Sequence, residues 1–523
     1  MTPLLFGVAA AAGLLLSAGC REKASLLVDA KTRRDFEARI LRAVEANKGK
    51  TCARPVLRGD AQEGDGTSSA VALVEGSAET RACLKLLDAR STNLQAALFV
   101  PAKERPMGYP DRRVSRPFKV GEPGEKVVAA VARACGPVVK RLRMAVRHRH
   151  GCSPYLPGLR CTPNWLGVIR AAEAIAASAR HLLIHGKVRE GVDLLLDLLR
   201  FSQDLERGGT SWLVVSIASG VASIAVPLLE RAFNQNTGFT TPQLDHWDRQ
   251  LSVLLNSEPH PSTSVRGEYQ SVTLETVLPQ FAGQGWKPPG TGCVVKMEAP
   301  RTSRRERYSV AAWQDVWALH ALVYEQIAKD MGLVCPSSAS PMFCDQALTR
   351  LAERYKRQGA SAFARLQSRL TSAKAQRRDP GLPALLELPG VNARYLRIQS
   401  RRRVSIAGLC LSVSYRRLAE ESGKCPARAA FDAAPLKSRR HDPYSGGQLL
   451  VRQSIPGRFV VSSPELTEAA GLDKAPAVVV SCQPKTSPNP APLPGMTAPP
   501  GVDPRPAVPR PAKPAASPSS AKH

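Results

Sequence analysis

Aromatic residues are scarce in this chain of 523 residues, at 5% of the total. Acidic residues are also few, with 44 against 73 lysines and arginines, and the formal net charge is +29. A chain this basic favours anionic partners. Apolar residues still make up 43%, so a sizeable core can form, and the length suits about three domains.

Motifs of common catalytic sites are missing as well. The sequence contains no Gly-x-Ser-x-Gly, no phosphate-binding loop, no dinucleotide fingerprint and no His-Glu-x-x-His. Cys-x-x-Cys is also absent, so neither a thioredoxin-like site nor a zinc knuckle is supported. We therefore assign no cofactor and no catalytic residue from the sequence, and an enzymatic activity stays undecided.

Residues 1–20 resemble the signal of a bacterial lipoprotein. An apolar run from Leu4 to Leu16 precedes Ser17-Ala18-Gly19-Cys20. Small residues suit a narrow peptidase pocket, and the Cys20 thiol is the group that accepts diacylglycerol. Arg21 rather than aspartate follows, which implies sorting to the outer membrane. We expect lipidation at Cys20, with palmitate among the acyl chains, on the periplasmic face of the outer membrane; an ordinary cleaved signal peptide is the alternative.

Eleven further cysteines fit an oxidising compartment. Their odd number leaves at least one free thiol, and connectivity cannot be read from sequence. For some of them, a role as a small buried apolar residue is the alternative. The pairs closest in sequence, which we take as candidate disulfides, are Cys152 with Cys161, Cys335 with Cys344, Cys410 with Cys425, and Cys52 with Cys83.

Helical spacing of apolar residues dominates the chain. We predict a mainly α protein with a multi-helix body and a small C-terminal α+β subdomain that contains a β-hairpin. The last residues are rich in Pro, Ala and Ser with scattered Lys and Arg, and a tail of this kind stays disordered. The predicted regions are a signal peptide (1–20), a mixed helical region (21–150), a helical core domain (151–380), a long helix plus β-hairpin (381–483) and the tail (484–523).

The largest core is expected from Trp165 to Phe233, which reads as three consecutive helices. No charge occurs between Thr210 and Leu229, and we interpret this run as a buried core helix. A membrane span is the weaker alternative, because a proline, a glycine and four serines interrupt it. The turn at His185-Gly186-Lys187 is similar to that of a single tetratricopeptide pair, which implies TPR-like helical hairpins.

Periodicity predicts further elements on both sides of this core. The expected helices are Ser25–Asn47, Ala78–Leu87, Glu125–Met144, one that begins at Thr241-Pro242, Ser262–Leu278, Ser309–Asp330, Asp345–Lys374 and Val391–Glu421. The expected strands are Gln448–Arg452, Arg458–Ser462 and Ala477–Ser481.

The C-terminal part resembles many uncharacterised bacterial envelope proteins and the globular end of major pseudopilins. A long helix stops at Ser422–Pro426, an Asp-Pro-aromatic turn follows at Asp442–Gly446, and a two-stranded ribbon ends near Phe459–Ser462. The chain lacks an apolar pilin-type helix at its start and an evident set of calcium ligands. The resemblance therefore implies the shape of this part rather than assembly into a fibre.

A basic patch is expected at the end of the Glu125–Met144 helix. Its members are Lys140, Arg141, Arg143, Arg147 and Arg149. Such a patch can hold the phosphates of lipid or lipopolysaccharide. The alternative is a solvated helix end, where cations complement the helix dipole.

Two histidines are weak metal candidates. His181 and His185 are four residues apart on one helix, so both imidazoles can face one ion. A catalytic zinc needs a third ligand, and an imidazolium at His185 also suits the end of a helix. We therefore predict no metal site.

The leading functional hypothesis is a lipid-anchored, non-enzymatic envelope adaptor or scaffold. Its partners would be the membrane, through the N-terminal lipid, and peptidoglycan, lipopolysaccharide or another envelope protein, but no nucleic acid. The first alternative is an accessory component of a secretion or pilus-like system. The second is a hydrolase with an unrecognised site in the Gly283–Tyr308 loop.

Overall fold

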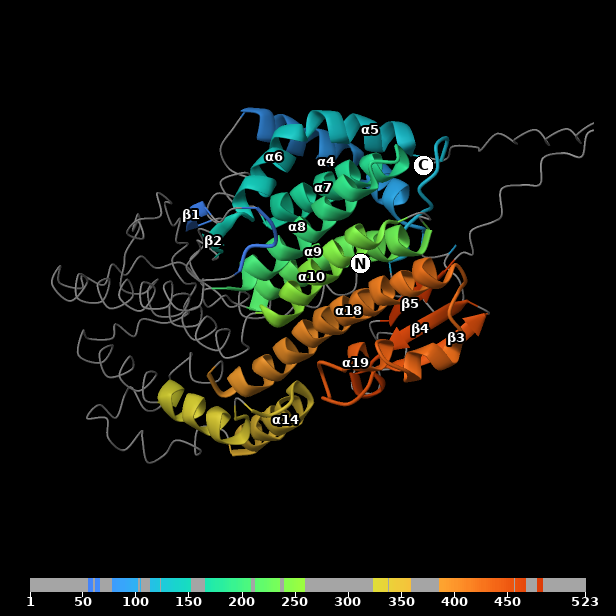
Figure 1. The fold of residues 1–523 in the computed structure, drawn as a ribbon. Coiled ribbons are helices and arrows are strands. Elements are labelled where there is room, and N and C mark those ends of the chain that lie inside the picture. The colour runs from blue at the N-terminus through green and yellow to red at the C-terminus, as the bar shows by residue number, and fades with distance from the viewer. Residues whose placement is uncertain are drawn as a thin grey trace, which may run out of the picture. The chain divides into compact units, whose positions relative to one another are not determined.

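The computed structural model describes fourteen stretches of the chain. These are residues 55–59, 62–65, 78–101, 104, 113–122, 124–151, 165–207, 212–235, 239–258, 323–336, 338–358, 385–455, 457–466 and 477–482. They are mainly helical, with one small antiparallel sheet and one short parallel strand pair (Figure 1).

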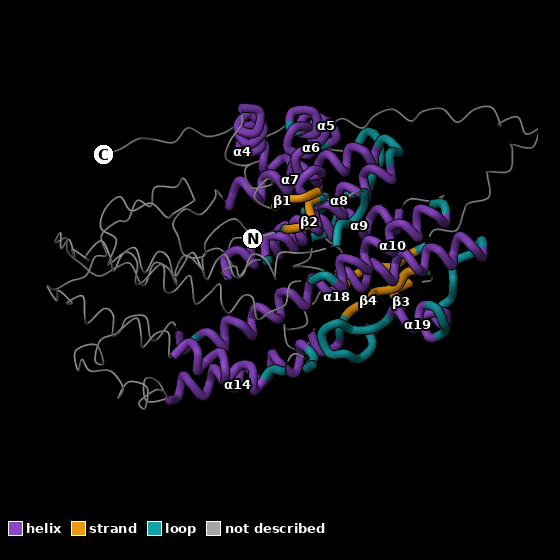
Figure 2. The backbone as a smooth tube through the Cα atoms, turned by 60° about the vertical axis from the view of Figure 1, so that its left-hand side comes forward, coloured by secondary structure: helices purple, strands orange, loops and turns teal. Residues whose placement is uncertain are grey.

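Seven helices build one apolar core in the first half of the chain. They are α4 (Ala78–Leu98), α5 (Glu125–Ala134), α6 (Gly136–Ala145), α7 (Trp165–Ile184), α8 (Val188–Glu206), α9 (Trp212–Gln235) and α10 (Thr241–Asn256). The three predicted central helices, α7 to α9, contribute most of the buried side chains. In both views these helices lie side by side, with α4, α5 and α6 along one edge (Figure 2).

Local sequence explains how the central helices begin and end. Gly186 adopts φ 75° between α7 and α8, a conformation that favours glycine, and Lys187 donates its backbone N–H to the Leu182 carbonyl. Thr240 and Gln243 form a reciprocal capping box at the start of α10. The helix boundaries in this region therefore follow from short-range chemistry.

One of the helices in this core is apolar along most of its length. Among the described residues, Val214–Gln235 within α9 is the one helix long and apolar enough to cross a bilayer. Its most apolar window is 67% buried against the rest of the protein. The predicted role as a core helix agrees with this burial.

Helix α18 (Leu388–Ser422) is shared by three apolar clusters. Its first turns pack with α14 (Pro341–Gln358) and the helical residues 323–334. Farther along, Ile406, Leu409 and Val413 join the core of the first seven helices. The opposite side, with Val404, Leu411 and Tyr415, packs under the C-terminal sheet. Figure 1 shows α18 running between the helical layer and the sheet.

The C-terminal sheet has the strand order β3–β4–β5 and is antiparallel throughout. Its strands are β3 (Leu450–Ile455), β4 (Arg458–Ser462) and β5 (Ala477–Ser481). Two short helices, η3 (Arg428–Asp432) and α19 (Leu436–Arg439), follow α18 in the chain and precede β3. The Asn234 side chain at the end of α9 bonds to β5, donating to the Val479 carbonyl and accepting from the Ser481 N–H.

The Asp-Pro-aromatic turn at Asp442–Gly446 connects neighbouring elements through hydrogen bonds. The fully buried Asp442 carboxylate accepts hydrogen bonds from the Tyr444 N–H (2.9 Å) and the Ser463 hydroxyl (2.7 Å). The Tyr444 hydroxyl donates to Asp345 of α14 (2.8 Å), which also forms an ion pair with Arg397 of α18 (2.7 Å). The residues behind the pseudopilin resemblance therefore hold α14, α18 and the sheet together.

Two disulfide pairings taken from sequence proximity are wrong. The structure joins Cys83 to Cys135 and Cys425 to Cys482, so neither Cys52–Cys83 nor Cys410–Cys425 forms. Packing of α4 against α5 brings Cys83 to Cys135. Cys410 lies buried within α18 with a free thiol, and the 12 residues from there to the helix end at Ser422 span about 18 Å, too far for a disulfide. The short-range pair Cys335–Cys344 does form.

Several predicted element boundaries also need correction. The predicted helix Glu125–Met144 is two helices, because Cys135 leaves helical geometry and Gly136-Pro137 starts α6. Helix α4 continues to Leu98 rather than ending at Leu87, and α14 begins at Pro341 rather than Asp345. Ser25–Asn47, Ser262–Leu278 and the tail lie outside the described residues.

Candidate functional site

Several sequence-predicted site residues fall outside the described part of the chain. They are the lipidation candidate Cys20, the disulfide candidates Cys52, Cys152 and Cys161, and the Gly283–Tyr308 loop. Their predicted roles stay predictions.

The basic patch lies at the end of α6 and in the strand that follows. Lys140, Arg147 and Arg149 are exposed, whereas Arg141 and Arg143 are half-buried. Arg143 lies against α8, where its guanidinium approaches the Glu190 carbonyl at 3.4 Å. Strand β1 (Gln62–Asp65), whose sequence is Gln-Glu-Gly-Asp, pairs in parallel with β2 (His148–His150). The strand pair therefore places the backbone of β1 beside the end of the patch that carries Arg149.

The two histidines do meet. The rings of His181 and His185 contact each other edge to face, with centroids 4.4 Å apart. Burial, and then the neighbouring His185, lower the pKa of His181, which favours a neutral imidazole. Within the described stretches, no group of three His, Cys, Asp or Glu side chains is placed to hold a metal ion.

The most elaborate polar arrangement among the described residues surrounds Arg402. Its guanidinium donates to Glu206 through Nη1 (2.5 Å to Oε1) and Nη2 (2.9 Å to Oε2). On its other side, Nε donates to Glu258 Oε1 (2.8 Å), and Nη2 also contacts the second oxygen of that carboxylate. One arginine thus bridges two carboxylates, and all three side chains are almost completely buried.

Neighbouring amides and hydroxyls complete this Arg402 cluster. Gln399 donates to Glu206 Oε2 (2.9 Å), and Gln203 donates to Glu258 Oε1 (2.9 Å). Arg200 donates to the Ser257 hydroxyl at 2.9 Å. The members come from α8, the end of α10 and α18. The cluster therefore joins elements that are distant in the chain, since Arg402 and Glu206 are 196 residues apart.

Electrostatics favour a charged Arg402 held between its partners. Burial opposes ionisation of the guanidinium, but Glu206 and Glu258 outweigh it and raise the pKa of Arg402. Burial raises the pKa of Glu206, since this carboxyl has lost all contact with water. Burial acts in the same direction on Glu258, but Arg402 and Gln203 outweigh it and hold the pKa of Glu258 below its usual value.

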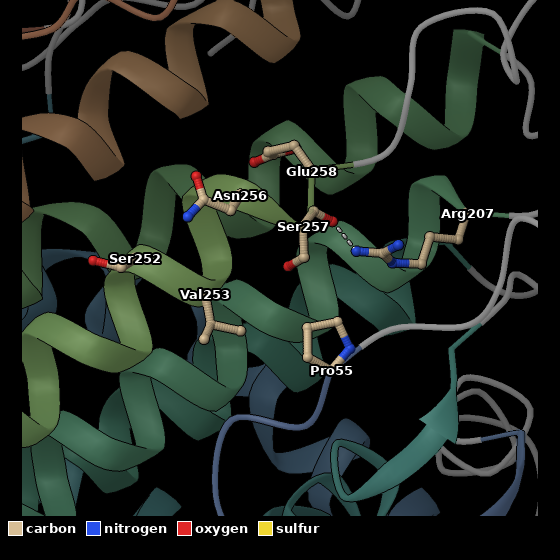
Figure 3. A pocket seen from close by; sticks show the side chains of 7 residues that line it. All are labelled: Pro55, Arg207, Ser252, Val253, Asn256, Ser257 and Glu258. Carbon is tan, nitrogen blue, oxygen red and sulfur yellow. Dashed lines mark hydrogen bonds between the residues drawn. The ribbon is translucent and has the colours of Figure 1, made fainter.

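A pocket of about 410 Å³ opens beside the Arg402 cluster. Figure 3 shows the residues that line it, among which the Arg207 guanidinium donates a hydrogen bond to the Ser257 carbonyl. Glu258 belongs both to this wall and to the cluster. The lining residues are Pro55, Arg207, Ser252, Val253, Asn256, Ser257 and Glu258.

Polar groups that line this pocket are already bonded to side chains of the neighbouring helices. The oxygens of Glu258 already accept from Arg402 and Gln203, and the Ser257 hydroxyl accepts from Arg200. Among these lining residues there is no histidine or cysteine, and no pairing of a nucleophile with a base. The arrangement can hold three helices in register and admit a small polar group at its edge.

The sequence analysis missed the Arg402 cluster. A signal was present, because the run Arg401-Arg402-Arg403 lies in a helix without an acidic residue from Leu388 to Ala419. Successive side chains on a helix point in different directions, so three adjacent arginines in a helix that packs on several sides predict that one of them faces inward. Which carboxylates would meet it depends on the packing of α8 and α10 against α18.

No protein-family model, no curated protein and no solved structure matches this chain.

Proposed function

We propose that this chain is a lipid-anchored protein of the periplasmic side of the outer membrane, where it serves as a non-enzymatic adaptor. Three disulfides among the described residues favour an oxidising compartment. They are the observation that carries the proposal, because they support the compartment that the lipoprotein-like segment at Cys20 implies. The net charge of +29 suits anionic cell-wall polymers and lipids.

The adaptor role is supported by the different surroundings of buried and exposed charged groups among the described residues. Buried polar groups such as Arg402 bond to each other and stabilise the fold, whereas cations such as Lys140 and Arg147 point to solvent. We assign the patch around Lys140, together with the basic tail, to contacts with peptidoglycan or lipopolysaccharide. The α7–α8 hairpin would act like a tetratricopeptide pair and help to dock a protein partner.

Labelling and fractionation test the anchor. A clickable fatty-acid probe should label the protein in growing cells, and Cys20→Ala should abolish the label and release the protein from membranes. An unlabelled protein recovered from the cell interior would contradict the proposal.

Retention on purified peptidoglycan tests the adaptor role. Lys140→Glu/Arg147→Glu should weaken retention at low salt, and added salt should remove the difference from the wild type. Equal retention of the two proteins at every salt concentration would count against the α6 patch.

The pseudopilin-like C-terminal part supports a second candidate, an accessory component of a secretion or pilus-like system. The observation that favours it is a long helix, α18, packed against an antiparallel sheet through the Asp442 turn. Crosslinking in membranes followed by mass identification would recover such a system as the partner, and recovery of cell-wall enzymes alone would weaken this candidate.

A further inference from the structure

Helix α14 presents an exposed face that combines an aromatic side chain with a row of cations. Phe343, Arg350, Arg354 and Arg357 follow one another at steps of seven, four and three residues, so they share one side of the helix. All four are exposed. From Phe343 to Arg357 the row extends about 21 Å along the helix axis.

The charge of this face is almost entirely positive. No carboxylate among the described residues forms an ion pair with Arg350 or Arg357, and the face contains one acidic residue, Glu353. Arg354 approaches Asp330 at 3.5 Å with half of its side chain exposed. An exposed pair of this kind is weak, so Arg354 remains available to a stronger anionic partner.

An apolar end adjoins the cations. Phe343 is 51% exposed and Leu333, in the preceding helical segment, is 72% exposed. The disulfide between Cys335 and Cys344 holds these two segments together, with Cα atoms 4.8 Å apart. The Met342 N–H also donates to the Tyr444 carbonyl at 3.0 Å, which ties this end of α14 to the Asp442 turn. The two segments that carry the apolar side chains are thus fixed to each other and to the Asp442 turn.

We propose that the exposed face of α14 docks onto the headgroup region of an anionic lipid bilayer. Arginines along the row bind lipid phosphates, and Phe343 and Leu333 insert between the headgroups at one end. A soluble anionic polymer would explain the cations but not the exposed apolar pair beside them, whereas an interfacial helix needs both. The proposal deepens the proposed function, since it gives the side of the protein that faces the membrane.

Vesicle binding of residues 21–523 tests the proposal without the acyl anchor. This chain contains every described element and lacks Cys20, so the result does not depend on whether lipidation occurs. Binding is measured by cosedimentation with phosphatidylcholine vesicles and with vesicles that also contain phosphatidylglycerol. We expect binding to the anionic vesicles only, and Arg350→Glu/Arg357→Glu should weaken it by about tenfold or more.

A matched variant separates this surface from general charge. Arg81→Glu/Lys85→Glu makes the same change in net charge at two exposed cations four residues apart on α4 and should change vesicle binding by less than about twofold. Peptidoglycan retention is tested by the α6 variant and vesicle binding by the α14 variant, so failure of one proposal is distinguishable from failure of the other. Equal weakening by both double variants would overturn the α14 surface, because binding would then follow net charge.

Apolar insertion has its own pair of variants. Phe343→Ser should weaken vesicle binding several-fold, whereas Met144→Ser, at a side chain that is 48% exposed on α6, should not. Unchanged binding of Phe343→Ser would overturn the bilayer as the partner. Urea unfolding midpoints equal to that of the wild type show that each variant is folded.

Discussion

Asp197 is a buried carboxylate on α8 whose neighbour is Arg58. Its exposed fraction is 1%, and Arg58 from the segment 55–59 forms its ion pair. Burial raises the pKa of Asp197 to about 6, and the positive charges of Arg58 and Arg143 only partly oppose this shift. The folded protein therefore holds the Asp197 proton more tightly than the unfolded chain does. The resulting stabilisation is present at low pH and is lost as the pH rises through about 6.

Asp197→Asn should remove this pH dependence at the residue scale. Between about pH 4 and about pH 6.5, the free energy of unfolding of the wild type relative to the variant should fall by up to ~3 kcal/mol. Urea unfolding at several pH values measures both curves. Asp88→Asn, at an exposed carboxylate on α4, is the control and should give a curve parallel to that of the wild type. Parallel curves for Asp197→Asn as well would contradict the assignment.

At the scale of elements, a glycine allows α18 to approach the sheet. A Cβ atom on Gly408 would lie 2.6 Å from Cγ2 and 2.7 Å from Cβ of Val478 on β5. Atoms cannot come so close, and the β-branched Val478 side chain is buried and cannot rotate away. The glycine is therefore a requirement of helix–sheet packing rather than of a turn.

Gly408→Ala should lower the free energy of unfolding by about 1–3 kcal/mol through overpacking. Gly136→Ala is the matched control, because nothing lies within 4 Å of a Cβ atom there. That substitution also replaces a helical glycine, and it should be neutral or slightly stabilising. Urea unfolding of both variants checks the difference, and similar values for the two would show that close packing at Gly408 is not the cause.

At the scale of the whole molecule, the Arg402 cluster connects α18, in the C-terminal part of the chain, to α8 and α10 of the first apolar core. Glu206 and Glu258 come from α8 and the end of α10, and Arg402 comes from α18. Two more pairs repeat the pattern along α10, Arg417 with Asp245 (3.1 Å) and Arg439 with Asp248 (2.5 Å). The C-terminal part is therefore attached to α10 by a row of ion pairs as well as by apolar packing.

Arg402→Met should lower the free energy of unfolding by about 3–5 kcal/mol, because it leaves two buried carboxylates without their cation. Adding Glu206→Gln and Glu258→Gln should recover much of this loss, since the charges are then gone. Arg417→Met, at a half-exposed pair, should cost no more than about 1 kcal/mol. Thermal and urea unfolding distinguish these outcomes, and equal losses for Arg402→Met and Arg417→Met would contradict a buried junction.

Prediction from sequence succeeded where the responsible interactions are local. The apolar spacing and Gly186 located α7 and α8, and strands Arg458–Ser462 and Ala477–Ser481 have the predicted bounds. Prediction failed where partners are distant in the chain. Cys83 and Cys425 each bond to a cysteine more than 50 residues away (sequence separations 52 and 57), which sequence proximity cannot indicate.

The sequence by itself determined the mainly helical character, the positions of the central helices and of strands β4 and β5, and the excess of positive charge, whereas β3 begins at Leu450 rather than at the predicted Gln448 and ends at Ile455 rather than at Arg452. Each of these follows from composition or from contacts within a few residues. Only the tertiary structure decided which arginines are buried, which cysteines distant in sequence are bonded and which cations remain on the surface. The physical reason is that burial and pairing depend on which faces of α8, α10, α14 and α18 meet, and that choice is made by the packing of the whole core.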